Sequence, residues 1–157
     1  MAAVLQQQET GYVIPPLSTH ESGSAALEVQ GTRMAAPRIR EAISVLFQQG
    51  RMELAIAVGE AAISVYPYSE DILVICALMA EVEQDWARAE SLLIRLIEVQ
   101  EGDAPATSWL HLLRVLRCQN KTADAIAVAE FAGTKYDADA ELQAEIASLR
   151  AVTGTAE

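Results

Sequence analysis

The stretch Gly50–Pro67 of the sequence, GRMELAIAVGEAAISVYP, has an apolar helical pattern that keeps a small residue at Ala55 and again at Ala62. A helix that only filled a core would more naturally carry leucine or isoleucine at both positions. Small residues at these places indicate that another backbone lies very close. Pro67 ends the pattern, because proline cannot donate the next helical hydrogen bond. The stretch therefore predicts a helix packed tightly against a neighbouring helix.

Two later stretches superimpose on the first without a gap. They are QDWARAESLLIRLIEVQE (84–101) and NKTADAIAVAEFAGTKYD (120–137). Their alanines Ala89 and Ala125 match Ala55, and the three matching alanines lie 34 and then 36 residues apart. This period predicts repeated helical hairpins, each of which buries its apolar face by stacking on the next.

Helical spacing of apolar residues extends from Pro37 to about Val152, with short polar breaks. We predict seven helices, at Pro37–Gln49, Met52–Val65, Glu70–Glu83, Trp86–Val99, Ala106–Cys118, Thr122–Lys135 and Ala138–Val152. The last helix has a single apolar stripe of Leu142, Ile146 and Leu149, while Glu141, Glu145 and Arg150 are expected to face water. It is predicted to cap the stack.

Residues 1–36 differ in character from residues 37–157. They combine QQQ, PP and STHESGSAA with only short apolar runs, which predicts an irregular N-terminal arm with a short helix around Ala25–Gln30. Its cluster Tyr12–Pro16 would dock on a partner or fold back on the repeat domain, and a flexible tail is the alternative. The predicted domains are therefore an arm, 1–36, and a helical repeat domain, 37–157.

The charge and hydropathy of the chain exclude two classes of partner. A net charge of −11 would repel nucleic-acid phosphates and anionic membrane surfaces. No window has the roughly 18 consecutive apolar residues that a membrane span needs, and no targeting segment precedes the repeats. We therefore expect a cytoplasmic protein that neither binds nucleic acid nor inserts into a membrane. Cys76 and Cys118 are expected to be reduced thiols in helices.

The sequence offers few groups for catalysis. Its two histidines are His20, in the arm, and His111, and neither has a second histidine at metal-ligand spacing. There is no glycine-rich phosphate loop and no complete calcium loop. We predict no enzyme activity, catalytic residue, metal or cofactor.

The hairpin period, together with the first helix WLHLLRVL, resembles the tetratricopeptide repeat family. Trp109, Leu112 and Leu116 fall on the family's first-helix row, and Ala125 and Ala132 on its second-helix row. In the first unit Ala55, Ala62 and Pro67 match, while Ile39 and Leu73 replace the tryptophan in the first and second units. The resemblance implies an all-α fold, with three helical hairpins stacked as a short right-handed superhelix and a C-terminal capping helix.

The resemblance also implies that the first helices line a concave groove. The residues expected to face it are Arg40, Ser44, Phe47, Val74, Leu78, Glu81, Leu110, Arg114 and Arg117. A peptide with apolar anchors and an acidic flank would suit this mixture, because two arginines stand at one end. Alternatively, the arm or a neighbouring subunit covers the apolar residues.

These features favour a non-enzymatic module that binds a protein or peptide, as an adaptor or a chaperone. The small size, acidity, loose arm and terminal helix are similar to the layout of small bacterial type III secretion chaperones. The alternative is a structural subunit that self-associates into a homo-oligomer or scaffolds a larger assembly.

Overall fold

The computed structural model describes residues 35–154, and this range contains helices and turns but no strand. The helices are α1 (Ala36–Gln48), α2 (Met52–Val65), α3 (Glu70–Val82), α4 (Trp86–Val99), α5 (Ala106–Cys118), α6 (Thr122–Lys135) and α7 (Ala140–Thr153). The prediction of an all-α fold with seven helices is confirmed. The chain divides into two units, 1–33 and 34–157, and the predicted arm with its Ala25–Gln30 helix lies outside the described residues.

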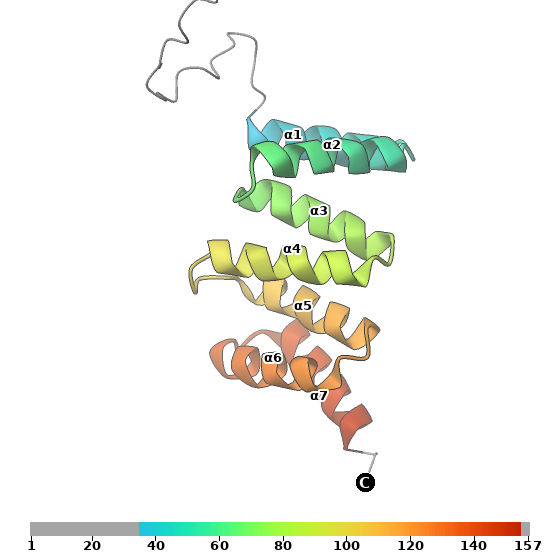
Figure 1. Cartoon of the computed structure of the whole chain (residues 1–157). Coiled ribbons are helices and arrows are strands. Elements are labelled where there is room, and N and C mark those ends of the chain that lie inside the picture. The colour runs from blue at the N-terminus through green and yellow to red at the C-terminus, as the bar shows by residue number, and fades with distance from the viewer. Residues whose placement is uncertain (1–34, 155–157) are drawn as a thin grey trace, which may run out of the picture. The chain divides into compact units, whose positions relative to one another are not determined.

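Three hairpins, α1/α2, α3/α4 and α5/α6, follow one another along the repeat unit, and α7 packs on α5 and α6 (Figure 1). Within each hairpin the turn depends on one residue with a left-handed backbone. These residues are Gly50, Gln84 and Asn120, with φ of 71°, 61° and 59°. They are the first residues of the three superimposed stretches, so the left-handed turn residue recurs with the same period as the buried alanines.

The helices pack closely at the repeated alanines, as the sequence predicted. Ala55, Ala89 and Ala125 are all 0% exposed. A Cβ added at Gly59 would lie 3.0 Å from Cys76 Sγ and 3.0 Å from Met79 Cε, which is tighter than ordinary van der Waals contact. Helix α2 therefore approaches α3 so closely that only glycine and alanine fit on its buried face.

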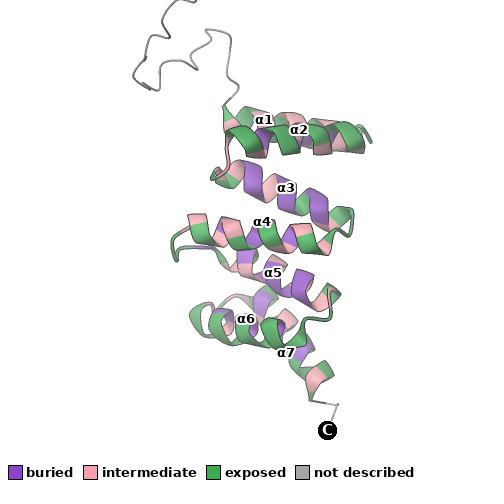
Figure 2. Ribbon diagram, viewed as in Figure 1, coloured by how far each residue is buried: buried purple, intermediate pink, exposed green. Residues whose placement is uncertain are grey.

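The core of the unit is densest in α3 and α5, which carry six buried residues each, more than any other helix (Figure 2). Helix α1 buries only Ile43. Its exposed residues Arg38, Glu41 and Gln48 stand where α3, 34 residues later, has Ile72, Ile75 and Val82. The face of α1 that would meet a preceding hairpin is thus mostly polar.

Helix α7 is in register with the first helices of the hairpins. The helices α1, α3, α5 and α7 start at Ala36, Glu70, Ala106 and Ala140, which are 34, 36 and 34 residues apart. Its apolar residues Leu142, Ile146 and Leu149 are buried, as expected of a cap. It starts two residues later than predicted because Asp139 caps it, accepting a hydrogen bond from the Leu142 backbone N–H at 2.9 Å.

One expectation for this helix is corrected. Glu145 does not face water: its side chain is 17% exposed and forms ion pairs with Arg114 and Arg117 of α5. The reason is the register, which turns this side chain toward α5 rather than away from it. Glu141 and Arg150 are exposed, as expected.

Candidate partner-binding groove

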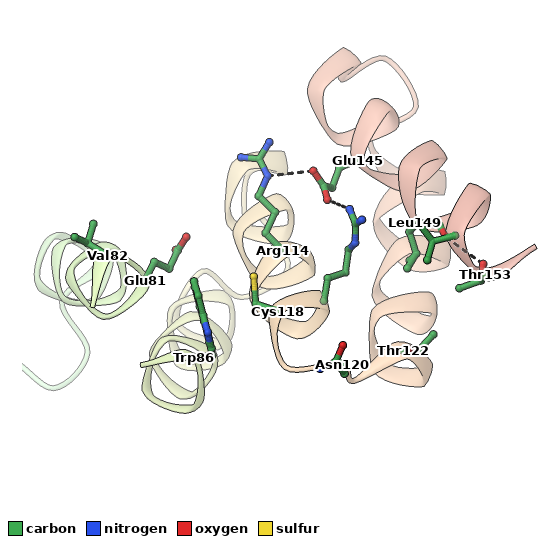
Figure 3. A pocket seen from close by; sticks show the side chains of 12 residues that line it. Glu81, Val82, Trp86, Arg114, Cys118, Asn120, Thr122, Glu145, Leu149 and Thr153 are labelled. Atoms are coloured by element: carbon green, nitrogen blue, oxygen red, sulfur yellow. Dashed lines mark hydrogen bonds and ion pairs between the residues drawn. The ribbon is translucent and has the colours of Figure 1, made fainter. Parts of the chain in front are cut away.

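Three adjoining hollows follow the first helices and form the candidate site, which we call the groove. The first hollow, of about 240 Å³, lies between α1 and α3. The second, of about 160 Å³, is lined by α3, α4 and α5. The third and largest, of about 670 Å³, is lined by residues from α3 to α7 (Figure 3). Leu78 lines the first two hollows, Glu81 the last two, and Val82 the first and third, so the three are continuous.

The floor and walls of the groove are largely apolar. Phe47 and Leu78 line the first hollow, and Leu78 is 38% exposed although its neighbours Ala77 and Met79 are buried. In the third hollow, Val82 on α3 stands across from Leu149 on α7 (Figure 3). Val82 is 58% exposed. Exposed apolar side chains gathered in a concavity are typical of a surface that binds another molecule.

Sequence reasoning missed Val82, Trp86 and Leu149 as groove residues. It followed one face of each first helix and stopped a residue before Val82. The available signal was the register, because Val82 corresponds to Gln48 and Cys118, which also line hollows.

Most of the expected groove residues line a hollow. Ser44 and Phe47 line the first, Val74 and Leu78 the second, and Arg114 and Arg117 the third, while Glu81 joins the second and third. Arg40 lines none of the three, and its Nη1 donates to Asp71 Oδ1 at 3.1 Å.

Leu110 was expected to face the groove, and this expectation is wrong. It is 3% exposed and belongs to the core. The equivalent residue of α3, Val74, is only half-buried. Helix α5 packs against α4, α6 and α7, and this packing covers Leu110.

The arginines at the α5 end of the groove are engaged by α7. Arg114 Nε donates to Glu145 Oε2 at 3.2 Å, and its Nη2 donates to Glu141 Oε1 at 3.0 Å. Arg117 pairs with the same Glu145 and also donates to Ser148 Oγ at 3.3 Å. Burial lowers the pKa of Arg114, but the hydrogen bonds that Arg114 donates to Glu145 and Glu141 outweigh this effect and raise that pKa above its ordinary value. Figure 3 shows Glu145 reaching from α7 to Arg114.

A hydrogen bond between α5 and α3 lies at the centre of the groove. His111 Nδ1 on α5 lies 2.9 Å and 3.0 Å from the two carboxylate oxygens of Glu81 on α3. A carboxylate only accepts, so Nδ1 must carry the proton. The contact has the same register as Arg117–Glu145, and Phe47 and Ile75 occupy the equivalent positions on α1 and α3. The same two positions of the repeat therefore provide an apolar pair, a Glu–His pair and an Arg–Glu pair along the groove.

The two cysteines differ in accessibility. Cys76 is buried, and burial raises the pKa of its thiol to about 11, so it stays protonated at neutral pH. Cys118 is exposed and lines the third hollow (Figure 3). A thiol-reactive label can therefore be attached inside the groove at Cys118.

No protein-family model matches the chain, and no curated protein matches it. Among solved structures, the chain is similar to the first TPR of Spaghetti (RPAP3) bound to the HSP90 peptide SRMEEVD. The identity is 16%, the TM-score is 0.65, and the match covers 76% of this chain and 93% of that chain. The fold is therefore a tetratricopeptide-type helical repeat, as the period of the alanines predicted.

The described residues contain neither a membrane span nor a metal-ligand cluster. No helix in the range 35–154 is long and apolar enough to cross a membrane. Within the same part of the chain, His, Cys, Asp and Glu side chains nowhere gather in a group of three that could hold a metal ion. The chemistry that the groove offers is apolar contact, hydrogen bonding and charge.

Proposed function

We propose that the protein is a non-enzymatic interaction module that holds a segment of a partner protein in the groove, as an adaptor or a chaperone. The observation that carries the proposal is the line of three continuous hollows with Leu78 and Val82 exposed in it. The similar TPR domain binds a peptide, which supports a binding role for the same fold here. A cytoplasmic location stays a prediction.

The narrower hypothesis, a type III secretion chaperone, draws no support from the comparisons and stays a prediction. The alternative of a self-associating structural subunit differs in what would occupy the groove. A second copy would fill it in a concentration-dependent way, whereas a partner segment would fill it only when the partner is present.

Cys118 allows a direct test. A benzophenone maleimide attached to Cys118 should cross-link a partner from host lysate, because the probe stands in the third hollow. The adduct should disappear in Leu78→Glu, which places a charge between the first two hollows. The matched control is Ile94→Glu, since Ile94 on α4 is 42% exposed but lines a depression away from the groove.

Circular dichroism and the unfolding midpoint must show that both variants are folded. An adduct that persists in Leu78→Glu and is lost in Ile94→Glu would contradict the proposal. An adduct formed only with the protein itself, growing with its concentration, would replace it by the self-associating subunit.

A further inference from the structure

The charges of the groove determine which segment it accepts, provided that the proposed binding function is correct. The third hollow is lined by Arg114 and Arg117, and three of the four guanidinium nitrogens that contact neighbouring side chains there bind glutamates of α7. An acidic segment would have to displace Glu141 or Glu145 to reach them. The earlier expectation of an acidic flank assumed free arginines, and these arginines are already paired.

Glu81, unlike these arginines, is still able to pair with an incoming group. Its side chain is 18% exposed and lines both the second and third hollows. Its described partner is a single imidazole nitrogen of His111, whereas a carboxylate has about four acceptor positions. Glu81 therefore has acceptor capacity for an incoming N–H donor without losing His111.

The apolar residues flank this carboxylate on both sides. Leu78 lies one helical turn before it and opens into the first hollow, while Val82 and Trp86 line the third hollow beyond it. A bound segment would thus meet apolar surface, then Glu81, then apolar surface again.

Whole-chain electrostatics favour the same kind of partner. The net charge of −11 attracts basic segments and repels acidic ones, including a second copy of this chain. We infer that the groove binds a partner segment with apolar side chains on both sides of a lysine or arginine that pairs with Glu81, and that it excludes acidic segments.

The experiment uses a randomised peptide library displayed on phage and selected against the full chain. Enriched peptides should combine aliphatic or aromatic residues with lysine or arginine, and binding should be lost in Leu78→Glu but kept in Ile94→Glu. A selected peptide is then synthesised with a fluorescent label in three forms, which carry lysine, glutamine or glutamate at the basic position. Fluorescence anisotropy should rank them in that order of affinity.

Glu81→Gln tests the assigned contact, because glutamine keeps the size and can still accept from His111. It should weaken the lysine peptide about fivefold, which corresponds to about 1 kcal/mol, and leave the glutamine peptide unchanged. Glu98→Gln is the matched control, since Glu98 is exposed on α4 outside the groove. It should leave both affinities unchanged.

Three results would overturn the inference in distinguishable ways. Acidic peptides that bind wild type and are lost in Leu78→Glu would reject the charge assignment and retain the binding function. If no enriched peptide depends on Leu78, both the assignment and the proposed groove function fail. An equal effect of Glu81→Gln and Glu98→Gln on the lysine peptide would show a general charge effect, and would also reject the contact with Glu81.

Discussion

Trp109 packs on the second helix of its hairpin and also carries a buried N–H with no hydrogen-bond partner among the described residues. Its ring lies 4.9 Å, centroid to centroid, from that of Phe131 on α6, which joins the two helices of the third hairpin. Its indole Nε1 is buried, and no hydrogen-bond partner is found for it among the described residues. The residue therefore stabilises the hairpin through its ring and not through its N–H.

Two substitutions at Trp109 separate these contributions. Trp109→Ala should lower the free energy of unfolding by about 3 kcal/mol, because it leaves a cavity beside Phe131. Trp109→Phe should cost less than about 1.5 kcal/mol, because it keeps an aromatic ring and removes an N–H that makes no bond. Urea unfolding followed by circular dichroism measures both. Equal costs for the two variants would mean that the N–H is satisfied in solution.

At the scale of single residues, the sequence predicted the small positions well and the surface positions less well. Ala55, Ala89 and Ala125 are buried as expected, because close approach of two backbones leaves no choice of side chain. Leu110 was placed in the groove and lies in the core, and Glu145 was placed in water and lies against two arginines. Helical spacing predicts on which face of its helix a residue lies, but the neighbouring helices determine how much of that face is covered.

Among the elements, α7 is held by both apolar packing and charge. Glu145 forms ion pairs with Arg114 and Arg117, and Glu141 forms an ion pair with Arg114 as well. From sequence alone, Arg114→Glu would be a stability-neutral change on a groove surface. The structure predicts otherwise, because the new carboxylate would face Glu141 and Glu145.

Arg114→Glu should therefore lower the free energy of unfolding by about 1–2 kcal/mol. Arg114→Gln, which removes the attraction without adding repulsion, should cost less than about 1 kcal/mol. Arg38→Glu is the control, since Arg38 is exposed on α1. Hydrogen exchange should show the loss of protection concentrated in α7. A cost for Arg114→Glu no larger than that of Arg38→Glu would contradict the α5–α7 pairing.

Helix α4 and the turn between α5 and α6 are joined by a contact that depends on pH. Glu90 accepts from Lys121 Nζ at 2.6 Å and from Gln119 Nε2 at 2.7 Å. The hydrogen bond from Lys121 lowers the pKa of Glu90 below its ordinary value of 4.5, although burial opposes this. A carboxyl whose pKa is lower in the folded state adds stability above its unfolded pKa and loses it as the pH falls through the folded pKa.

The stability difference between wild type and Glu90→Gln should therefore be present at pH 7 and shrink below about pH 4.5. Its size at pH 7 is about 0.5–1 kcal/mol, because Lys121 is partly exposed and water screens the pair. Urea unfolding at a series of pH values measures the difference. A difference that stays constant down to pH 3 would mean that Glu90 and Lys121 are not paired.

For the whole molecule, the period of the alanines carried nearly all the architectural information. It gave the hairpins, their order and the capping role of α7, because a repeated unit must bury its apolar face on its neighbour. It did not give the contacts of Glu81, Arg114 and Arg117. These contacts depend on how successive first helices are staggered along each other. Rotating one of these helices by one residue, about 100°, would pair different side chains.

A stack of hairpins should also lose stability locally. Among the described helices, each hairpin contacts only its neighbours, and α1/α2 is the first hairpin, whose first helix buries one residue. Ala55→Leu should overpack the α1/α2 crossing and cost about 1–3 kcal/mol. Because stability in such a stack is a sum of repeat and interface terms, the cost should appear first where the strain lies.

Hydrogen exchange measured by mass spectrometry should then show faster exchange in α1 and α2 of Ala55→Leu, with α5 to α7 little changed. Ala125→Leu is the matched variant at the other end, and its effect should appear in α5, α6 and α7. If both variants accelerate exchange evenly through all seven helices, the unit unfolds as one cooperative body. Interfaces between hairpins would then outweigh the hairpins themselves, and any partner that orders one part of the groove would stabilise the whole.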